Sequence, residues 1–104
     1  MIYKATQKFP REEAFGLTSQ MRRCATSITS NIAEGFSRNT YKDKTKFYYT
    51  AKGSLTELQN QLLIAKDINI INKNNFNKLS EQTIESHKLI NGLIRKSKDL
   101  DSRL

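Results

Sequence analysis

Apolar residues recur at steps of three and four along most of this chain, which is the spacing that aligns side chains on one face of an α-helix. The most regular run comprises Tyr48, Ala51, Leu55, Leu58, Leu62 and Ala65. Its alternating steps are typical of helices that pack as in a coiled coil. Phe47, Leu63 and Ile64 widen the apolar face beyond that of a two-stranded coil. We therefore predict a long helix here that ends near residues 68–71.

Two other segments carry the same spacing, one before this helix and one after it. The earlier stripe comprises Leu17, Met21, Cys24, Ala25, Ile28, Ile32 and Phe36, and the later one comprises Phe76, Leu79, Thr83, Ser86, Ile90, Leu93, Ser97 and Leu100. With Gly 4 and Pro 1 in the whole chain, few positions interrupt a helix. The pattern predicts helices joined by short connections.

Capping residues predict where these helices begin and end. Thr40 is followed three residues later by Asp43, and this spacing is typical of an N-cap, whose side chain accepts a hydrogen bond from a backbone N–H of the first turn. Asn72 predicts the next helix start in the same way. Gly35 is expected to close the preceding helix in a left-handed conformation. Before that helix, we expect a short first helix over residues 2–8 and a single helical turn over residues 11–15, interrupted by Gly16.

Small polar residues alternate with the apolar stripe of the second segment. They are Ser27, Thr29, Ser30 and Asn31, which are poor helix formers on an exposed surface. Small side chains allow another helix to approach closely, and hydroxyl groups can donate to the carbonyl one turn earlier. We therefore expect this segment to be a central helix with neighbours on more than one side.

Together these elements predict an all-α fold, an antiparallel up-and-down helical bundle of the four-helix type with a short first helix, as one domain over residues 1–104. The chain has 104 residues, of which 37% are hydrophobic. A chain this short buries a small share of its surface. We therefore expect the bundle to associate into an oligomer.

Positive charge is the strongest functional signal, since 18 Lys+Arg stand against 10 Asp+Glu, giving a formal net charge of +8. This excess favours contact with a polyanion such as RNA or DNA, and the alternative is a lysine-rich surface that serves solubility alone. Basic residues concentrate between Arg38 and Lys52 among aromatic residues that could stack on bases. Our candidate nucleic-acid-binding residues are Arg22, Arg23, Arg38, Lys42, Lys44, Lys46, Tyr49 and Lys52.

Catalytic and metal-binding patterns are missing from the sequence. His87 is the only histidine and Cys24 the only cysteine, no pair has metal-ligand spacing, and no glycine-rich phosphate loop occurs. We therefore expect no enzyme, no metal and no cofactor. Cys24 lies in an apolar stripe and is expected to be a buried hydrophobic residue. No apolar run is long enough to span a membrane, so we expect a cytoplasmic protein that makes no membrane contact.

One long motif resembles a known family. The stretches "FPREEAFGLTSQMRRCATSITSNIAEGFSRN", "FYYTAKGSLTELQNQLLIAKDINII" and "HKLINGLIRK" are similar to the four-helix-bundle proteins first noted as open reading frames in 23S rRNA intervening sequences. The resemblance runs from about Thr6 to Lys98. It implies an antiparallel bundle that assembles as a homopentamer. The chain is also similar to the accessory proteins of diversity-generating retroelements, which contact a reverse transcriptase and nucleic acid.

The resemblance also indicates interface positions, and this chain departs from the family pattern in two places. Besides three of the arginines above, the matching signature positions are Ser30, Asn31, Glu34 and Gly35, which we treat as interface candidates. Thr29 stands where the family has proline, so a kink in that helix is expected to be relaxed. The family's first helix begins well upstream, so we expect this sequence to hold only its end.

Two functions follow from these patterns. The first is a non-catalytic accessory protein that associates with RNA or an RNA/DNA hybrid through its basic residues. The alternative is a protein-interaction scaffold for an enzyme encoded nearby, such as a reverse transcriptase, without nucleic-acid contact. The carboxylate of Glu34, near a helix C-terminus, is expected to need a cationic partner, most simply Arg22, Arg23 or Arg38, in this chain or a neighbouring one.

Overall fold

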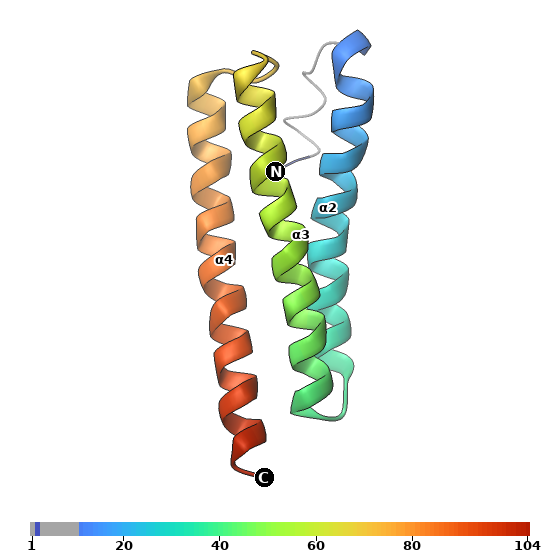
Figure 1. Cartoon of the computed structure of the whole chain (residues 1–104), viewed down its shortest axis with the longest axis vertical. Helices are drawn as coiled ribbons and strands as arrows, with labels where there is room; N and C mark the ends of the chain where they lie inside the picture. The colour runs from blue at the N-terminus through green and yellow to red at the C-terminus, as the bar shows by residue number, and fades with distance from the viewer. Residues whose placement is uncertain (1, 3–10) are drawn as a thin grey trace.

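Three long helices make up the described part of the chain. The computed structural model describes residue 2 and residues 11–104, with the side chains of Ile2 and of residues 16–104. The helices are α2 (Arg11–Ser37), α3 (Tyr41–Asp67) and α4 (Lys73–Ser102), and consecutive helices run antiparallel (Figure 1). The all-α antiparallel prediction is confirmed. The short first helix predicted over residues 2–8 lies, apart from Ile2, outside the described residues.

Helix α3 occupies the middle of the molecule, because α2 and α4 both pack along it (Figure 1). The prediction that the second segment is the central helix is therefore wrong for the described structure. Of the four small polar residues of α2, Ser27 and Asn31 are half-buried towards α3, whereas Thr29 and Ser30 are exposed. The hydroxyl oxygens of Ser27 and Ser54 lie 2.7 Å apart, and the Asn31 amide donates to the Ser27 carbonyl at 2.8 Å. Small side chains thus allow close approach, as expected, but towards a single neighbour.

The core follows the predicted stripes. All six stripe residues of α3 are buried, and Met21 and Cys24 of α2 and Leu79 and Ile90 of α4 pack around them. Thr83 occupies an apolar position, but its hydroxyl is hydrogen-bonded. Its hydroxyl donates to the Ser80 carbonyl at 2.7 Å and accepts from the Gln59 amide at 3.2 Å.

Both predicted N-caps are confirmed. The Thr40 hydroxyl accepts from the Asp43 N–H at 3.1 Å, and the Asn72 side chain accepts from the Asn75 N–H at 2.7 Å. The turn after α3 reverses at Asn69, whose φ of 62° is left-handed. Asparagine tolerates this conformation better than most residues, and it lets the Ile70 N–H donate to the Ala65 carbonyl at 2.9 Å. The end of α3 near residues 68–71 is therefore confirmed.

Both glycine predictions in the second segment are wrong. Helix α2 passes through Gly16 without a break, because a glycine costs a helix only about 1 kcal/mol and neighbouring packing offsets that. Gly35 lies inside α2, and no described glycine has a positive φ. Its role is steric, since a Cβ there would overlap the ring of Tyr48.

Candidate nucleic-acid interface

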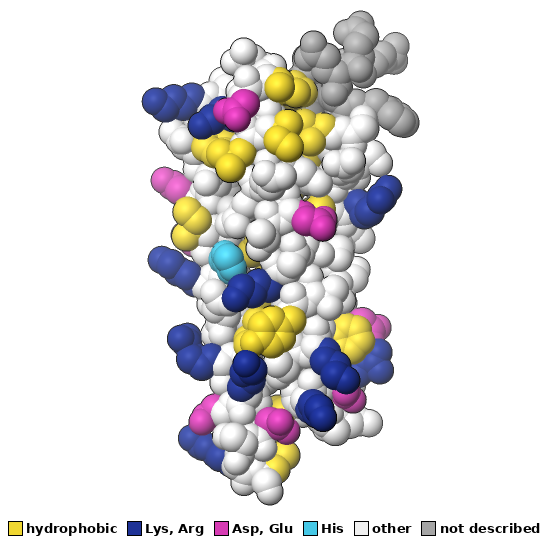
Figure 2. All heavy atoms as spheres, viewed as in Figure 1, with side chains coloured by type: hydrophobic (Ala, Val, Ile, Leu, Met, Phe, Trp, Pro, Cys, Tyr) yellow, Lys and Arg dark blue, Asp and Glu magenta, His cyan; other side chains and the backbone are white. Residues whose placement is uncertain are grey.

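Basic residues from two helices meet at one end of the bundle. The start of α3 lies beside the end of α4, because the helices are antiparallel (Figure 1). Figure 2 shows lysine and arginine side chains gathered over this end, around hydrophobic side chains. We call this surface the basic end and define it by Arg38, Lys42, Lys46, Tyr49, Lys52, Arg95 and Lys98.

Tyr49 is the aromatic centre of the basic end. The residue is 44% exposed, which leaves its ring accessible to a partner, and the Nζ of Lys98 lies 5.3 Å from the ring centroid. Lys98 and Arg95 come from α4 and were not among the sequence candidates. The signal that could have found them is the antiparallel register of the two helices, which sets Lys98 opposite Tyr49.

The lysines of α3 keep their charge available. Lys42 and Lys46 are exposed and Lys52 is half-buried. Within the described part of the chain, none of the three forms an ion pair. Asp43 is the only carboxylate between Arg38 and Lys52. It lies in the first turn of α3, where the helix dipole favours a negative charge. The local field therefore remains positive.

Arg38 is held in place at the junction of α2 and α3. Its guanidinium donates to the Glu34 carboxylate at 3.0 Å and lies 4.5 Å from the centroid of the Phe47 ring. The expected cationic partner of Glu34 is therefore Arg38, one turn further along the chain. Because both side chains are about half exposed (45% and 54%), the arginine still faces solvent.

Lys44 has a different position from its neighbours. Its ammonium donates to the backbone carbonyls of Phe36 at 2.8 Å and Gly35 at 3.2 Å, which belong to the last turn of α2. A cation there satisfies carbonyls that have no partner within the helix and complements the helix dipole. Among the candidate lysines of α3, Lys44 is therefore the one whose ammonium is bonded to the backbone of the protein itself.

Arg22 and Arg23 lie apart from the basic end. Arg22 lies 15 residues before Ser37, the last residue of α2, which is about 22 Å along the axis. Both arginines border a shallow depression of about 490 Å³ together with Ser19 and Thr26. The structure therefore does not bring them together with the lysines of α3.

The four interface candidates divide into two pairs. Ser30 and Glu34 are exposed on α2, whereas Asn31 is half-buried and Gly35 buried against α3. The buried pair is explained by packing within this chain. The exposed pair remains available to a partner.

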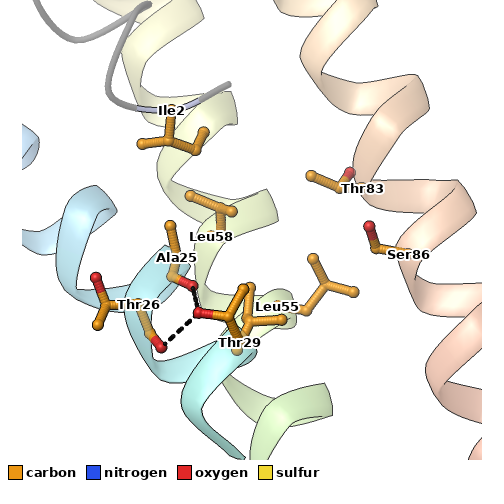
Figure 3. Close-up of a pocket in the computed structure, with 9 residues that line it drawn as sticks. Ile2, Ala25, Thr26, Thr29, Leu55, Leu58, Thr83 and Ser86 are labelled. Atoms are coloured by element: carbon orange, nitrogen blue, oxygen red, sulfur yellow. Dashed lines mark hydrogen bonds between the residues drawn. The ribbon is translucent and has the colours of Figure 1, made fainter. Parts of the chain in front are cut away.

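An apolar groove runs between α2 and α4 on the side of the bundle away from the basic end. Figure 3 looks into its upper part with α2 on the left and α4 on the right, the reverse of Figure 1. Here Ile2 lies above Leu58 and Ala25 and is 2% exposed. Further along, Ile32, Phe36 and Leu93 line an open volume of about 550 Å³. Phe36 is 59% exposed, although it continues the predicted stripe of α2, because α4 does not reach across the groove to cover it.

His87 and Cys24 are the described side chains whose chemistry most often serves catalysis or metal binding. His87 is half-buried, and its Nε2 has no hydrogen-bond partner. Among the described residues, no three His, Cys, Asp or Glu side chains could together hold a metal ion. Burial raises the pKa of the Cys24 thiol, and its hydrogen bond to the Glu57 carboxylate at 3.5 Å adds to the shift. A thiol with a raised pKa is a poor nucleophile, so Cys24 behaves as the buried hydrophobic residue that was predicted.

No helix in residues 11–104 combines the length and apolar character that crossing a membrane requires. A family model described as "23S rRNA-intervening sequence protein" matches residues 1–92. A search of curated proteins finds no match.

Proposed function

The chain belongs to the 23S rRNA-intervening sequence protein family, and from that premise we propose that it is a non-catalytic accessory protein that binds RNA or an RNA/DNA hybrid at its basic end. The observation that carries this proposal is the meeting of lysine side chains from α3 and α4 around an exposed tyrosine. Cations bind phosphates, and an exposed ring can stack on an unpaired base.

Charge geometry favours a nucleic acid over a compact acidic ligand. The cations are spread along two helices: Lys42 and Lys52 are ten residues apart on α3, or about 15 Å. That span suits a polyanion with repeated phosphates better than a single carboxylate or phosphate. Arg38 adds a planar guanidinium, which can bind a phosphate through two hydrogen bonds.

The test is direct binding of the purified protein to a structured RNA hairpin at 50 and 200 mM salt. Six or more phosphate contacts would lower affinity by about a thousandfold over this range, because each contact releases counterions. Affinity that stays flat with salt, or no binding to any RNA or DNA at low salt, contradicts the proposal.

The second candidate function is a scaffold for a neighbouring gene product such as a reverse transcriptase. The groove between α2 and α4 favours it, because Phe36 and Leu89 expose large apolar surfaces at its edge. If the purified candidate enzyme still binds this chain in a pull-down after nuclease treatment, the scaffold function is supported. Loss of the complex on nuclease treatment supports the nucleic-acid proposal instead.

Self-association belongs to the same proposal. The resemblance suggests a homopentamer, and the short chain with its partly uncovered groove supports assembly in general. An assembly would also multiply the basic ends and so raise avidity for a long nucleic acid.

A further inference from the structure

We propose that Tyr49 and Lys98 form a binding site for one unpaired nucleotide, with the base stacked on the tyrosine ring and a phosphate bound by the lysine ammonium. The inference rests on the proposed function, because the site lies within the basic end. It narrows the ligand from nucleic acid in general to strands or loops whose bases are unpaired. The lysines of the basic end then supply affinity for any nucleic acid, and Tyr49 discriminates between unpaired and paired bases.

Tyr49 is the ring of the basic end that a flat ligand can reach. Of the four aromatic residues between positions 38 and 52, Tyr41 and Phe47 are half-buried and Tyr48 is buried. The guanidinium of Arg38 also lies over the Phe47 ring, 4.5 Å from its centroid. Tyr49 is 44% exposed, on the side of α3 that meets α4. Base stacking needs only such an exposed ring, since every base has a flat face.

Lys98 places a cation on a flexible side chain beside this ring. The residue is exposed, and its Nζ lies 5.3 Å from the Tyr49 centroid. Within the described part of the chain it forms no ion pair, and the neighbouring Asp99 carboxylate is bound by Arg103 at 2.9 Å. A cation over an exposed ring is held only weakly, and the lysine stem is flexible. The ammonium can therefore move from the ring to a phosphate when a base stacks on the ring.

The two groups of the site match the two recognisable parts of a nucleotide. A nucleotide carries a flat base and a phosphate on the same sugar, and the protein presents a ring and an ammonium 5.3 Å apart. Tyr49 belongs to α3 and Lys98 to α4. The site therefore depends on the register in which these two helices pack.

Cations also flank the ring along its own helix. Lys46 precedes Tyr49 by three residues and Lys52 follows it by three. Both therefore lie on the same side of α3 as the ring, about 4.5 Å before and after it along the axis. A strand whose base stacks on Tyr49 thus has a cation on each side for the phosphates of the neighbouring nucleotides. This row suits a continuous single strand better than a free mononucleotide.

A duplex cannot use the tyrosine ring in this way. Its bases are paired and stacked on one another, whereas unpaired bases can turn outward and stack on a side chain. Contacts between lysines and phosphates form with either kind of ligand. Loss of the Tyr49 ring should therefore weaken the binding of an unpaired strand alone, and loss of a lysine charge should weaken the binding of both.

The test compares a short single-stranded RNA without self-complementarity and an RNA duplex of the same length, each titrated at low salt by fluorescence anisotropy. Tyr49→Leu keeps the charge and the helix propensity of the chain. It should lower the affinity for the single strand by about tenfold and the affinity for the duplex by less than about twofold. Tyr49→Phe retains the ring and should bind the single strand as the parent does. Circular dichroism checks that helix content is equal in all variants.

Two charge variants are the matched controls. Lys46→Gln and Lys98→Gln each remove one phosphate contact, so each should weaken the binding of both ligands by similar factors. The inference is overturned if Tyr49→Leu leaves single-strand affinity unchanged, if it weakens both ligands equally, or if Lys98→Gln has no effect. In each of these cases, salt-dependent binding by the parent leaves the proposed function standing. If the parent binds neither ligand at low salt, the proposed function fails and this inference fails with it.

Discussion

Gly35 illustrates how one residue decides the distance between two helices. It is buried inside α2, and a Cβ built on it would lie 2.9 Å from Cδ1 of the Tyr48 ring, well within normal contact distance. The ring itself is fixed, because Tyr48 is 2% exposed and packs edge-on against Phe36 with centroids 6.0 Å apart. Neither partner can move without disturbing the α2–α3 contact.

We expect Gly35→Ala to lower the free energy of unfolding by about 1–3 kcal/mol through overpacking, measured by urea denaturation. Gly53→Ala is the matched control, because Gly53 is an exposed helical glycine with no atom near its added Cβ. It should raise stability by about 0.5–1 kcal/mol. If Gly35→Ala were as stabilising as Gly53→Ala, the packing account of Gly35 would be wrong.

The raised pKa of the Cys24 thiol predicts that the free energy of unfolding decreases at alkaline pH. Burial raises the pKa of its thiol in the folded state, whereas the unfolded thiol ionises near its ordinary pKa of about 8.5. Between those two pKa values the unfolded state has released a proton that the folded state retains, so the free energy of unfolding falls as pH rises. Below about pH 7 both states hold this proton and the contribution is constant.

Urea unfolding of the parent and of Cys24→Ala between pH 7.5 and 9.5 measures this effect. The parent should lose stability more steeply over the upper part of this range, and the variant should lose it less steeply. The Tyr48 hydroxyl, whose pKa burial also raises, remains in both proteins and is therefore controlled for. Identical pH slopes would show that Cys24 does not ionise on unfolding.

At the scale of elements, Lys44 links the end of α2 to the start of α3. Its ammonium donates to two carbonyls of the last turn of α2. We expect Lys44→Met to cost about 1 kcal/mol of unfolding free energy, through the loss of these charged hydrogen bonds. The matched control is Lys42→Met, whose side chain is exposed and forms no ion pair with described residues. It should change stability by less than about 0.5 kcal/mol, and equal losses in the two variants would contradict this role of Lys44.

The helices themselves could be predicted from sequence because their signals are local. The stripe from Tyr48 to Ala65 and the caps at Thr40 and Asn72 depend on neighbours within one or two turns. The roles of Gly16 and Gly35 could not be predicted from neighbours within one or two turns. Whether a glycine ends a helix or allows a close contact depends on what packs against it, and for Gly35 that is the ring of Tyr48 from another helix.

At the scale of the whole molecule, some features of the candidate site depend on one helix alone and others depend on how two helices pack. The exposure of Tyr49 and the free charge of Lys42 and Lys46 could be predicted from α3 alone. The contribution of Lys98 could not, because it requires the register of α4 on α3. The separate position of Arg22 follows from the length of α2 between Arg22 and Ser37, which the predicted stripe from Leu17 to Phe36 already implied.

The arrangement of charge also explains how one small bundle can serve two contacts. The basic end faces one side of the α3–α4 pair (Figure 2), and the apolar groove opens on the other side (Figure 3). A polyanion bound to the first surface is therefore not in the way of a protein bound to the second. The net charge of +8 opposes assembly of bare copies, and a bound nucleic acid would relieve that repulsion.

The central claim is that nucleic acid binds at the basic end rather than to positive charge in general. Two double variants with equal loss of charge separate these possibilities: Lys42→Gln with Lys46→Gln at the start of α3, and Lys73→Gln with Lys78→Gln at the start of α4. All four lysines are exposed and lie within the first two turns of their helices, so effects on helix stability are matched. The start of α4 lies at the opposite end of the bundle (Figure 1).

The decisive measurement is the salt dependence of RNA affinity for the parent and both double variants. We expect the loss of Lys42 and Lys46 to reduce the slope of log affinity against log salt by about two, one for each lost phosphate contact. Loss of Lys73 and Lys78 should leave the slope of the parent unchanged. Equal reductions in both variants, or a reduction only in the α4 variant, would contradict binding at the basic end.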